Sequence, residues 1–238
     1  MIVTEVVPRS LDAVDVDTAP DVTASWFAAR YAQPADTVRI NMITALTGAA
    51  SGHDGTSESL TGGADRAILR AVRAAADVVL VGARSVRAEG YILPRRARLA
   101  VLTATGDLAG HRFRLPGDDS ADAPLILCPA SRFAAVRTQI GDLPVELAPL
   151  STDAAPPAAA LAHLRKMGLN RIVCEGGPSL ASQLAQLDAV DEYCVSIAPA
   201  LEPASSAFIA VTERVPTHLT GMLVDEDGYS YLRLTARR

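Results

Sequence analysis

The sequence has no hydrophobic run long enough to cross a bilayer and no excess of basic residues. No apolar stretch approaches the roughly 20 residues that a membrane-spanning helix needs. The net charge of −5 and the pI near 5.4 argue against nucleic acid or an anionic membrane as a partner, because both favour a basic face. The N-terminus also carries acids where a signal peptide has a basic segment. We therefore expect a cytoplasmic protein.

Cysteine and histidine are scarce and scattered. The three cysteines, Cys128, Cys174 and Cys194, are far apart, and no two form a C-x-x-C pair. The four histidines show neither H-x-E nor H-x₃-H spacing. These patterns predict that the protein binds no metal and that each cysteine is a small buried apolar residue.

What the sequence does contain is an alternation of short apolar runs and helical patterns. The apolar runs predict strands at 38–45, 77–82, 98–103, 124–129, 145–148, 171–175 and 191–199, and the helical patterns lie at 65–76, 132–140, 156–167 and 178–187. Two closing runs, 219–224 and 229–234, flank an Asp-Gly pair that favours a hairpin. The order predicts an α/β fold with a mixed sheet. We expect one domain over 38–238, with residues 1–37 as an extension that carries a helix near 25–31 and packs on it.

Two turns at predicted strand ends have the layout of an anion site. "EGGPSL" (175–180) joins a strand to a helix through two glycines, and "VGARSVRAEGY" (81–91) runs from a strand into a polar turn. Ligands of open α/β sheets collect at the carboxyl ends of strands, and helix N-termini favour anions. Neither turn is a G-x-G-x-x-G motif or a P-loop. From the residues alone, phosphate binding and ordinary turn chemistry both stay open.

Five segments, in order along the chain, carry a resemblance: "NMITALTG" (41–48), "VGARSVRAEGY", "CEGGPSL" (174–180), "VDEYCVSIAPAL" (190–201) and "DEDGYSYLRL" (225–234). The sequence resembles the pyrimidine reductase family of riboflavin biosynthesis, which shares its fold with dihydrofolate reductase. The resemblance implies a dihydrofolate reductase-like, three-layer α/β/α fold with a mostly parallel mixed sheet and a C-terminal antiparallel hairpin. It also implies NADPH-dependent reduction of the ribosyl group of 5-amino-6-(5-phosphoribosylamino)uracil, or of its diamino precursor, to a ribityl group.

The resemblance further implies a set of site residues. The expected cofactor-binding residues are Thr44, Gly82, Ala83, Ser85, Thr103, Thr105, Gly176, Gly177, Pro178, Ser179 and Leu180. The expected substrate-binding residues are Asn41, Thr47, Arg73, Arg95, Arg96 and Glu175. Glu175 and Glu89 are the candidate proton donors, and the sequence does not choose between them and a water. For Glu175 the alternative is an acid that interacts favourably with the dipole of the following helix.

The chain departs from the family pattern at two places. The family motif S-L-D-G becomes Ala45-Leu46-Thr47-Gly48, and threonine cannot hold the charge of the missing aspartate. A reductase of the same fold acting on another pterin or pyrimidine, such as dihydrofolate, therefore stays open, as does a non-catalytic nucleotide-binding protein. No arginine lies between Thr103 and Thr105, so NADPH rests on the resemblance and NADH is not excluded.

The zinc deaminase that often accompanies this reductase has no counterpart here, since neither H-x-E nor P-C-x-x-C occurs. We expect a stand-alone reductase. The family commonly dimerises, so the resemblance also implies a homodimer whose small-molecule partner is a phosphorylated pyrimidine.

Overall fold

The computed structural model describes residues 1–17, 20–91, 93–113, 122–151, 155–204 and 207–237. Its strands are β1 (Ile2–Val7), β2 (Ala13–Asp15), β3 (Val38–Ala45), β4 (Val78–Gly82), β5 (Arg98–Leu102), β6 (Leu125–Cys128), β7 (Glu146–Pro149), β8 (Ile172–Cys174), β9 (Glu192–Ala198), β10 (Thr217–Asp225) and β11 (Ser230–Ala236). Its α-helices are α1 (Pro20–Arg30), α2 (Asp65–Ala75), α3 (Ala83–Ala88), α4 (Phe133–Ile140), α5 (Pro156–Lys166) and α6 (Pro178–Gln186), with 3₁₀ turns η1 (Glu58–Leu60) and η2 (Ala130–Arg132). No described helix is long and apolar enough to cross a membrane.

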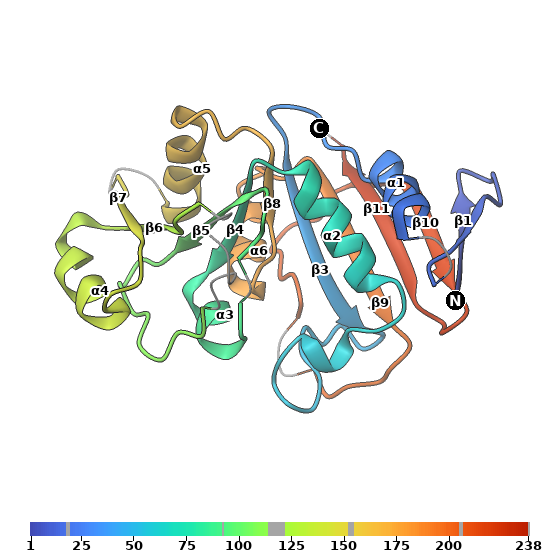
Figure 1. Cartoon of the computed structure of the whole chain (residues 1–238), viewed down its shortest axis with the longest axis horizontal. Coiled ribbons are helices and arrows are strands. Elements are labelled where there is room, and N and C mark those ends of the chain that lie inside the picture. The colour runs from blue at the N-terminus through green and yellow to red at the C-terminus, as the bar shows by residue number, and fades with distance from the viewer. Residues whose placement is uncertain (18–19, 92, 114–121, 152–154, 205–206, 238) are drawn as a thin grey trace.

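The described strands form a single twisted sheet in the order β2-β1-β10-β11-β9-β3-β8-β4-β5-β6-β7 (Figure 1). From β9 to β7 every neighbouring pair is parallel. From β9 to β2 every pair is antiparallel, and β10 and β11 form the hairpin that the Asp-Gly pair predicts. The predicted mixed sheet with a C-terminal hairpin is therefore confirmed.

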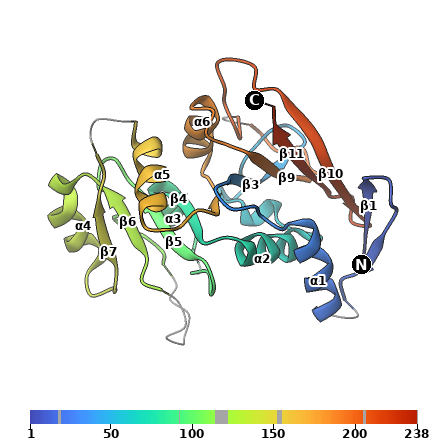
Figure 2. The same ribbon diagram turned by 90° about the horizontal axis from the view of Figure 1, so that it is seen from above.

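Both faces of the parallel region are buried. In β4, Val79 and Val81 belong to one hydrophobic core, while Val78 and Leu80 belong to the other. Helices α1 to α4 cover the first core and α5 and α6 the second, which gives three layers (Figure 2). The continuous apolar runs of the sequence reflect this double burial, because a strand covered on both faces does not alternate between apolar and polar residues.

The N-terminal residues contribute more than a helix. Strand β1 pairs with β10, so that Val3 lies opposite Asp225, and β2 pairs with β1. Helix α1 packs beside α2 through Phe27, which is buried. Strands β1 and β2 are not expected from the sequence, because the partner of β1 lies more than 200 residues away along the chain.

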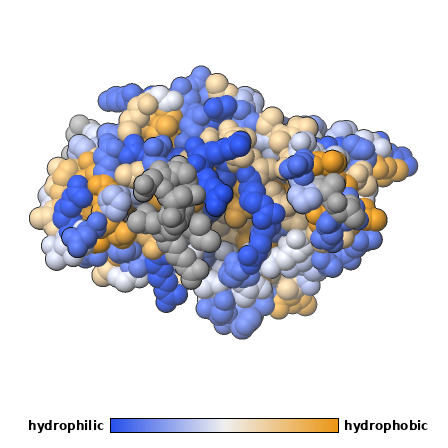
Figure 3. All heavy atoms as spheres, viewed as in Figure 1, coloured by the Kyte–Doolittle hydropathy of each residue, from blue (hydrophilic) through white to orange (hydrophobic). Residues whose placement is uncertain are grey.

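The segment after β4 also differs from the expectation of a polar turn. It forms the short helix α3, whose Val86 is fully buried, so the strand passes directly into a helix at Gly82. The helices on this face bury apolar side chains inward and leave polar ones outside. In α2, Ile68 and Val72 are buried, whereas the outer surface over this helix is hydrophilic (Figure 3).

Candidate active site

A cleft of about 1100 Å³ opens at the carboxyl ends of the central parallel strands, between α3 and the loop that precedes α2. In Figure 1 these strand ends point to the lower edge of the sheet. The cleft brings together most of the predicted site residues from five separate segments: Asn41, Arg73, Gly82, Ala83, Ser85, Glu89, Thr103, Thr105, Glu175, Gly177, Pro178, Ser179 and Leu180.

The other predicted site residues do not line this cleft. Thr44 is buried, and its hydroxyl donates to the carbonyls of Ala45 and Ala49. The hydroxyl of Thr47 donates to the carbonyl of Glu202 at 2.5 Å. Arg95 and Arg96 are exposed on the segment before β5. A binding role for these four residues stays a prediction.

Gly176 lies just behind the cleft wall and holds two turns together. Its carbonyl accepts a hydrogen bond from Gly82 N at 2.8 Å, which joins the end of β4 to the turn after β8. Its φ of +87° is a conformation that favours glycine, and a Cβ atom there would lie 3.1 Å from Met42 Sδ. The peptide bond between Gly176 and Gly177 is cis.

One half of the cleft is made largely of backbone and small side chains. Gly177 precedes α6 without a side-chain cap, and a Cβ atom on it would lie 3.0 Å from Ser85 Oγ. The first N–H groups of a helix lack intrahelical partners and carry partial positive charge. Pro178 has no N–H to lose at this position, and Ser179 adds a hydroxyl. This arrangement fits the phosphates of a dinucleotide.

Two threonines after β5 border the same half. Thr103 is buried, and its Oγ1 accepts a hydrogen bond from Gly106 N at 3.0 Å. Thr105 is exposed, and its Oγ1 accepts from Asp107 N at 3.3 Å. Among the described residues neither hydroxyl donates a hydrogen bond, so each can donate to a ligand oxygen.

The other half of the cleft is made of charged side chains. Arg73 of α2 donates two hydrogen bonds of 2.7 Å to the carboxylate of Glu175, and Tyr91 Oη donates a further short one. The Glu175 side chain is only 7% exposed. Two residues that the resemblance assigned to the substrate are thus bound to each other.

Electrostatics hold this cluster in one protonation state. Burial lowers the pKa of Arg73, but the charge of Glu175 and its hydrogen bonds outweigh burial, and the net pKa is raised. Burial, together with the charge of Glu175, raises the pKa of the Tyr91 phenol well above its usual range. Arg73 therefore stays charged and Tyr91 stays neutral, so both keep donating to Glu175.

The remaining predicted acid, Glu89, accepts a hydrogen bond from Ser57 N at 3.0 Å. Tyr91 and Asp65 also line the cleft, and neither is among the site residues expected from the sequence. Tyr91 stands inside a quoted motif, and Asp65 opens a helix directly after two glycines and an alanine. Arg70 and Arg84 line the cleft as well, and neither has an ion-pair partner in the described part of the chain.

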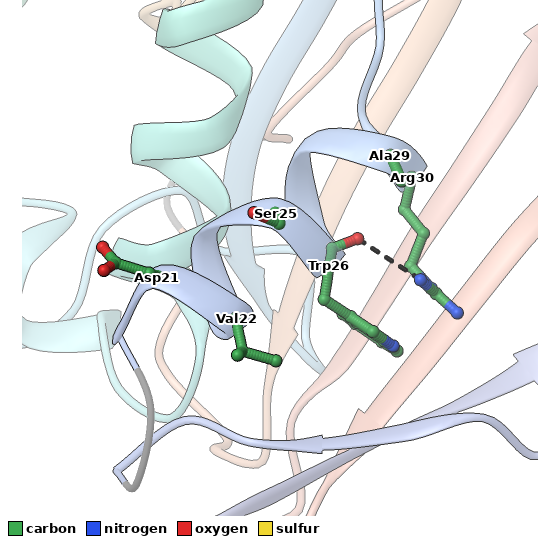
Figure 4. Close-up of a pocket in the computed structure, with 6 residues that line it drawn as sticks. All are labelled: Asp21, Val22, Ser25, Trp26, Ala29 and Arg30. Carbon is green, nitrogen blue, oxygen red and sulfur yellow. Dashed lines mark hydrogen bonds between the residues drawn. The ribbon is translucent and has the colours of Figure 1, made fainter.

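A second hollow lies over α1, and Figure 4 shows its six lining residues, which all belong to that helix. Its largest side chains are Trp26 and Arg30, whose guanidinium carbon sits 3.5 Å from the centre of a Trp26 ring. Only one carboxylate, Asp21, faces it among its six lining residues. The cleft at the strand ends is the better candidate for chemistry, because convergent polar groups gather there.

Residues 36–202 match the family of the RibD C-terminal domain. The chain belongs to this family. The match spans the strands and turns that form both halves of the cleft, from β3 to the segment that follows β9.

Solved structures show the same fold. A pyrimidine reductase-like protein from Corynebacterium diphtheriae superposes with a TM-score of 0.71 at 23% identity, over 85% of this chain and 92% of that one. A diaminohydroxyphosphoribosylaminopyrimidine deaminase/5-amino-6-(5-phosphoribosylamino)uracil reductase from Thermotoga maritima gives 0.66 at 19% identity, over 85% of this chain and 57% of that one. The riboflavin biosynthesis reductase Rib7 from Saccharomyces cerevisiae gives 0.62 at 15% identity, over 92% and 99%. No curated protein sequence gives a significant match.

Proposed function

We propose that this protein is a nicotinamide-dependent reductase of the riboflavin pathway. Its substrate would be 5-amino-6-(5-phosphoribosylamino)uracil, or the diamino precursor, whose ribosyl group is reduced to ribityl. Family membership supports the proposal. The observation that carries it is the single cleft in which a backbone-built anion cradle faces a charged side-chain cluster.

The backbone-built half would hold the cofactor. Gly82 and Gly177 allow close approach of a ligand, and the N-terminus of α6 with Ser179 would bind its phosphates. When bound, the nicotinamide supplies a hydride. We propose NADPH as the donor, with Thr103 and Thr105 near its additional phosphate. Arg84 lines the same cleft and has no ion-pair partner in the described part of the chain.

The side-chain half would hold the substrate. Glu175 is fixed as an acceptor by Arg73 and Tyr91, so it suits sugar hydroxyls or ring N–H groups rather than a phosphate. The charge of Arg73 is already balanced by Glu175. Arg70, one turn earlier on α2 and exposed, is the better phosphate ligand within the cleft.

We also propose that the protein is a cytoplasmic homodimer. Leu46 and Leu201 are 63% and 79% exposed and lie on neighbouring segments, since Leu46 N donates to Ala200 O. Contiguous exposed apolar side chains favour association. Sedimentation analysis of the purified chain tests this. We also keep the proposed division into an extension of residues 1–37 and a reductase domain of 38–238. The family match, over residues 36–202, supports where that domain begins.

Thermal unfolding with NADPH, with NADH and without ligand tests the cofactor. A ligand at 100 times its dissociation constant stabilises the folded state by about 2.7 kcal/mol, a shift of several degrees for a chain of this size. We expect a shift with NADPH and a smaller one with NADH. Oxidation of NADPH, followed by its absorbance after addition of the ribosylaminopyrimidine, then tests the substrate. Absence of both a shift and turnover would refute the proposed function.

A further inference from the structure

Asp65 is an acid in the cleft wall for which the function so far has no role. It is the first residue of α2 and is 9% exposed, although it lines the cleft. The preceding turn fits closely against the C-terminal hairpin, because a Cβ atom on Gly63 would lie 2.1 Å from Asp225 Oδ2. Ala64 N donates to Tyr231 Oη at 2.7 Å. The turn thereby fixes the start of α2 and directs Asp65 toward the sheet.

Asp65 has one hydrogen-bond partner among the described residues. Ser196 Oγ on β9 donates to Asp65 Oδ1 at 2.6 Å, and in that part of the chain no cation or backbone N–H contacts the carboxyl group. The chain separation of the two residues is 131 positions, so only the tertiary fold creates this pair.

The other carboxyl groups of the cleft are all stabilised as anions. Glu175 accepts from Arg73 and Tyr91. Glu58 pairs with Arg66, and Glu89 accepts from a backbone N–H. Among the described lining residues, Asp65 is thus the acid whose ionised form receives the least support.

On balance the surroundings of Asp65 raise the pKa of its carboxyl group. Burial raises its pKa, the hydrogen bond from Ser196 opposes this, and the negative charge of Glu175 raises it further. Arg66 lowers the pKa but is itself paired with Glu58, which raises it. On the hairpin side, Asp225 Oδ2 accepts hydrogen bonds from Ala64 N and Tyr231 Oη. The other facing titratable groups there are Tyr229 and Tyr231. Their own pKa values are raised, mainly by burial, so they stay neutral at ordinary pH.

We propose that Asp65 is the proton donor of the reduction, an inference that rests on the function proposed above. The Asp65 carboxyl proton passes to the ring oxygen O4′ of the ribosyl group as the C1′–O4′ bond breaks and the nitrogen lone pair forms a C1′=N iminium. One hydride from the dinucleotide then adds to C1′ and restores the neutral amine. The substrate thus gains one proton and one hydride, the dinucleotide is oxidised, and water in the open cleft reprotonates Asp65.

The test compares Asp65→Asn, which keeps the shape of the side chain, with Glu58→Gln, a second lining carboxyl that is largely exposed. Loss of a general acid lowers rate by roughly 10²–10⁴-fold. We expect that loss in kcat for Asp65→Asn and less than a twofold change for Glu58→Gln, while NADPH shifts the melting temperature of both equally. An Asp65→Asn rate within threefold of the wild-type rate overturns the assignment. A wild-type protein without turnover refutes the proposed function instead.

Two further readouts distinguish a proton donor from a structural residue. Because Ser196 lowers the pKa of Asp65, Ser196→Ala should move the alkaline fall of kcat to higher pH, whereas an unmoved fall contradicts the proposal.

The second readout needs no cofactor. A raised carboxyl pKa stabilises the fold below the ordinary pKa and loses that contribution as pH rises through the folded value. The stability of wild type relative to Asp65→Asn should therefore fall with increasing pH, and a constant difference would overturn the proposal.

Discussion

The two halves of the cleft are built by different means. The cofactor half depends on what is missing from its residues, namely the side chains of Gly82, Gly176 and Gly177, and on the start of α6. The substrate half depends on side chains that arrive from distant elements, with Arg73 on α2 and Glu175 after β8. The cofactor half should therefore be sensitive to added atoms and tolerant of changes in charge. The substrate half should be sensitive to changes in charge and more tolerant of added atoms.

This difference predicts where stability and function separate. In the side-chain half, the charges that would contact a ligand are already paired with each other within the fold. Removing one partner of such a pair should therefore lower the stability of the protein more than its affinity for the ligand. In the backbone half, the start of α6 lines the cleft and has no side-chain cap. Changes there should cost more in binding than in folding, unless they alter the backbone conformation itself.

The largest effect is expected for Arg73→Met. Removal of the cation leaves Glu175 buried and uncompensated. We expect this to lower the free energy of unfolding by about 2–3 kcal/mol, less than the roughly 3–5 kcal/mol of fully buried pairs, because Arg73 is 21% exposed. Urea denaturation measures it. Arg70→Met, one turn away and without an ion pair in the described chain, is the matched control and should change stability by less than about 0.5 kcal/mol. The double variant Arg73→Met/Glu175→Gln should recover part of the loss. Equal stability of the two single variants would show that the pair is not the support of this half.

The next largest loss of stability is expected for Gly176→Ala, a substitution in the cofactor half of the cleft. Alanine at a φ of +87° costs about 1–2 kcal/mol, and its Cβ atom would press on Met42. Gly82→Ala is the control, since its Cβ atom would meet its neighbours at 3.8 Å or more, an ordinary contact. We expect unfolding of Gly82→Ala to match wild type while its NADPH-induced thermal shift is reduced. An unchanged shift would mean that the cofactor does not approach this backbone.

The same contrast explains which features the sequence predicts. The glycine turns, the strands and the hairpin are local patterns, so the order of residues alone places "VGARS" and "EGGPSL" at strand ends. The side-chain half is not local. Arg73 and Glu175 are 102 positions apart, and a sequence alone does not say that they bind each other. Strands β1 and β2 of the extension are not predicted for the same reason, because β1 is stabilised by pairing with β10, which is distant in the sequence.

The arginines show a related limit. The resemblance places a cation at Arg95 or Arg96, yet both lie exposed outside the cleft, whereas Arg70 and Arg84 line it. The spacing of charged surface residues in a sequence does not show which of them border a cleft and which face open solvent. Helix α2 could have supplied the signal, since Arg66, Arg70 and Arg73 recur at helical spacing.

A smaller effect is expected for Tyr91→Phe, which removes one hydrogen bond to Glu175 and keeps the ring. The loss should be about 1 kcal/mol. Because the phenol pKa is raised in the folded protein, its stabilising contribution is complete below pH 10 and is lost only as pH rises beyond that. Urea denaturation at several pH values between 6 and 9 should therefore give a constant difference between the two proteins. A difference that varies over this range would show that the pKa of Tyr91 is not raised.

The smallest effect is expected at the cysteines, and it tests how firmly the two halves are joined. All three cysteines are buried, as the sequence predicts, and burial raises the pKa of Cys174 and Cys194 to about 12. At pH 8 a thiol reagent should modify none of them in the folded protein and all three after denaturation, as mass spectrometry can count.

Cys174 ends strand β8, and Glu175 and Gly176 follow it directly. The slow labelling of Cys174 therefore reports opening of this junction between the two halves of the cleft. If the side-chain half holds the strand end closed, Arg73→Met should accelerate labelling of Cys174 more than Gly82→Ala does. Equal rates would mean that the backbone hydrogen bond between Gly82 and Gly176 is enough to keep the junction closed, and that the two halves are less separate than their construction suggests.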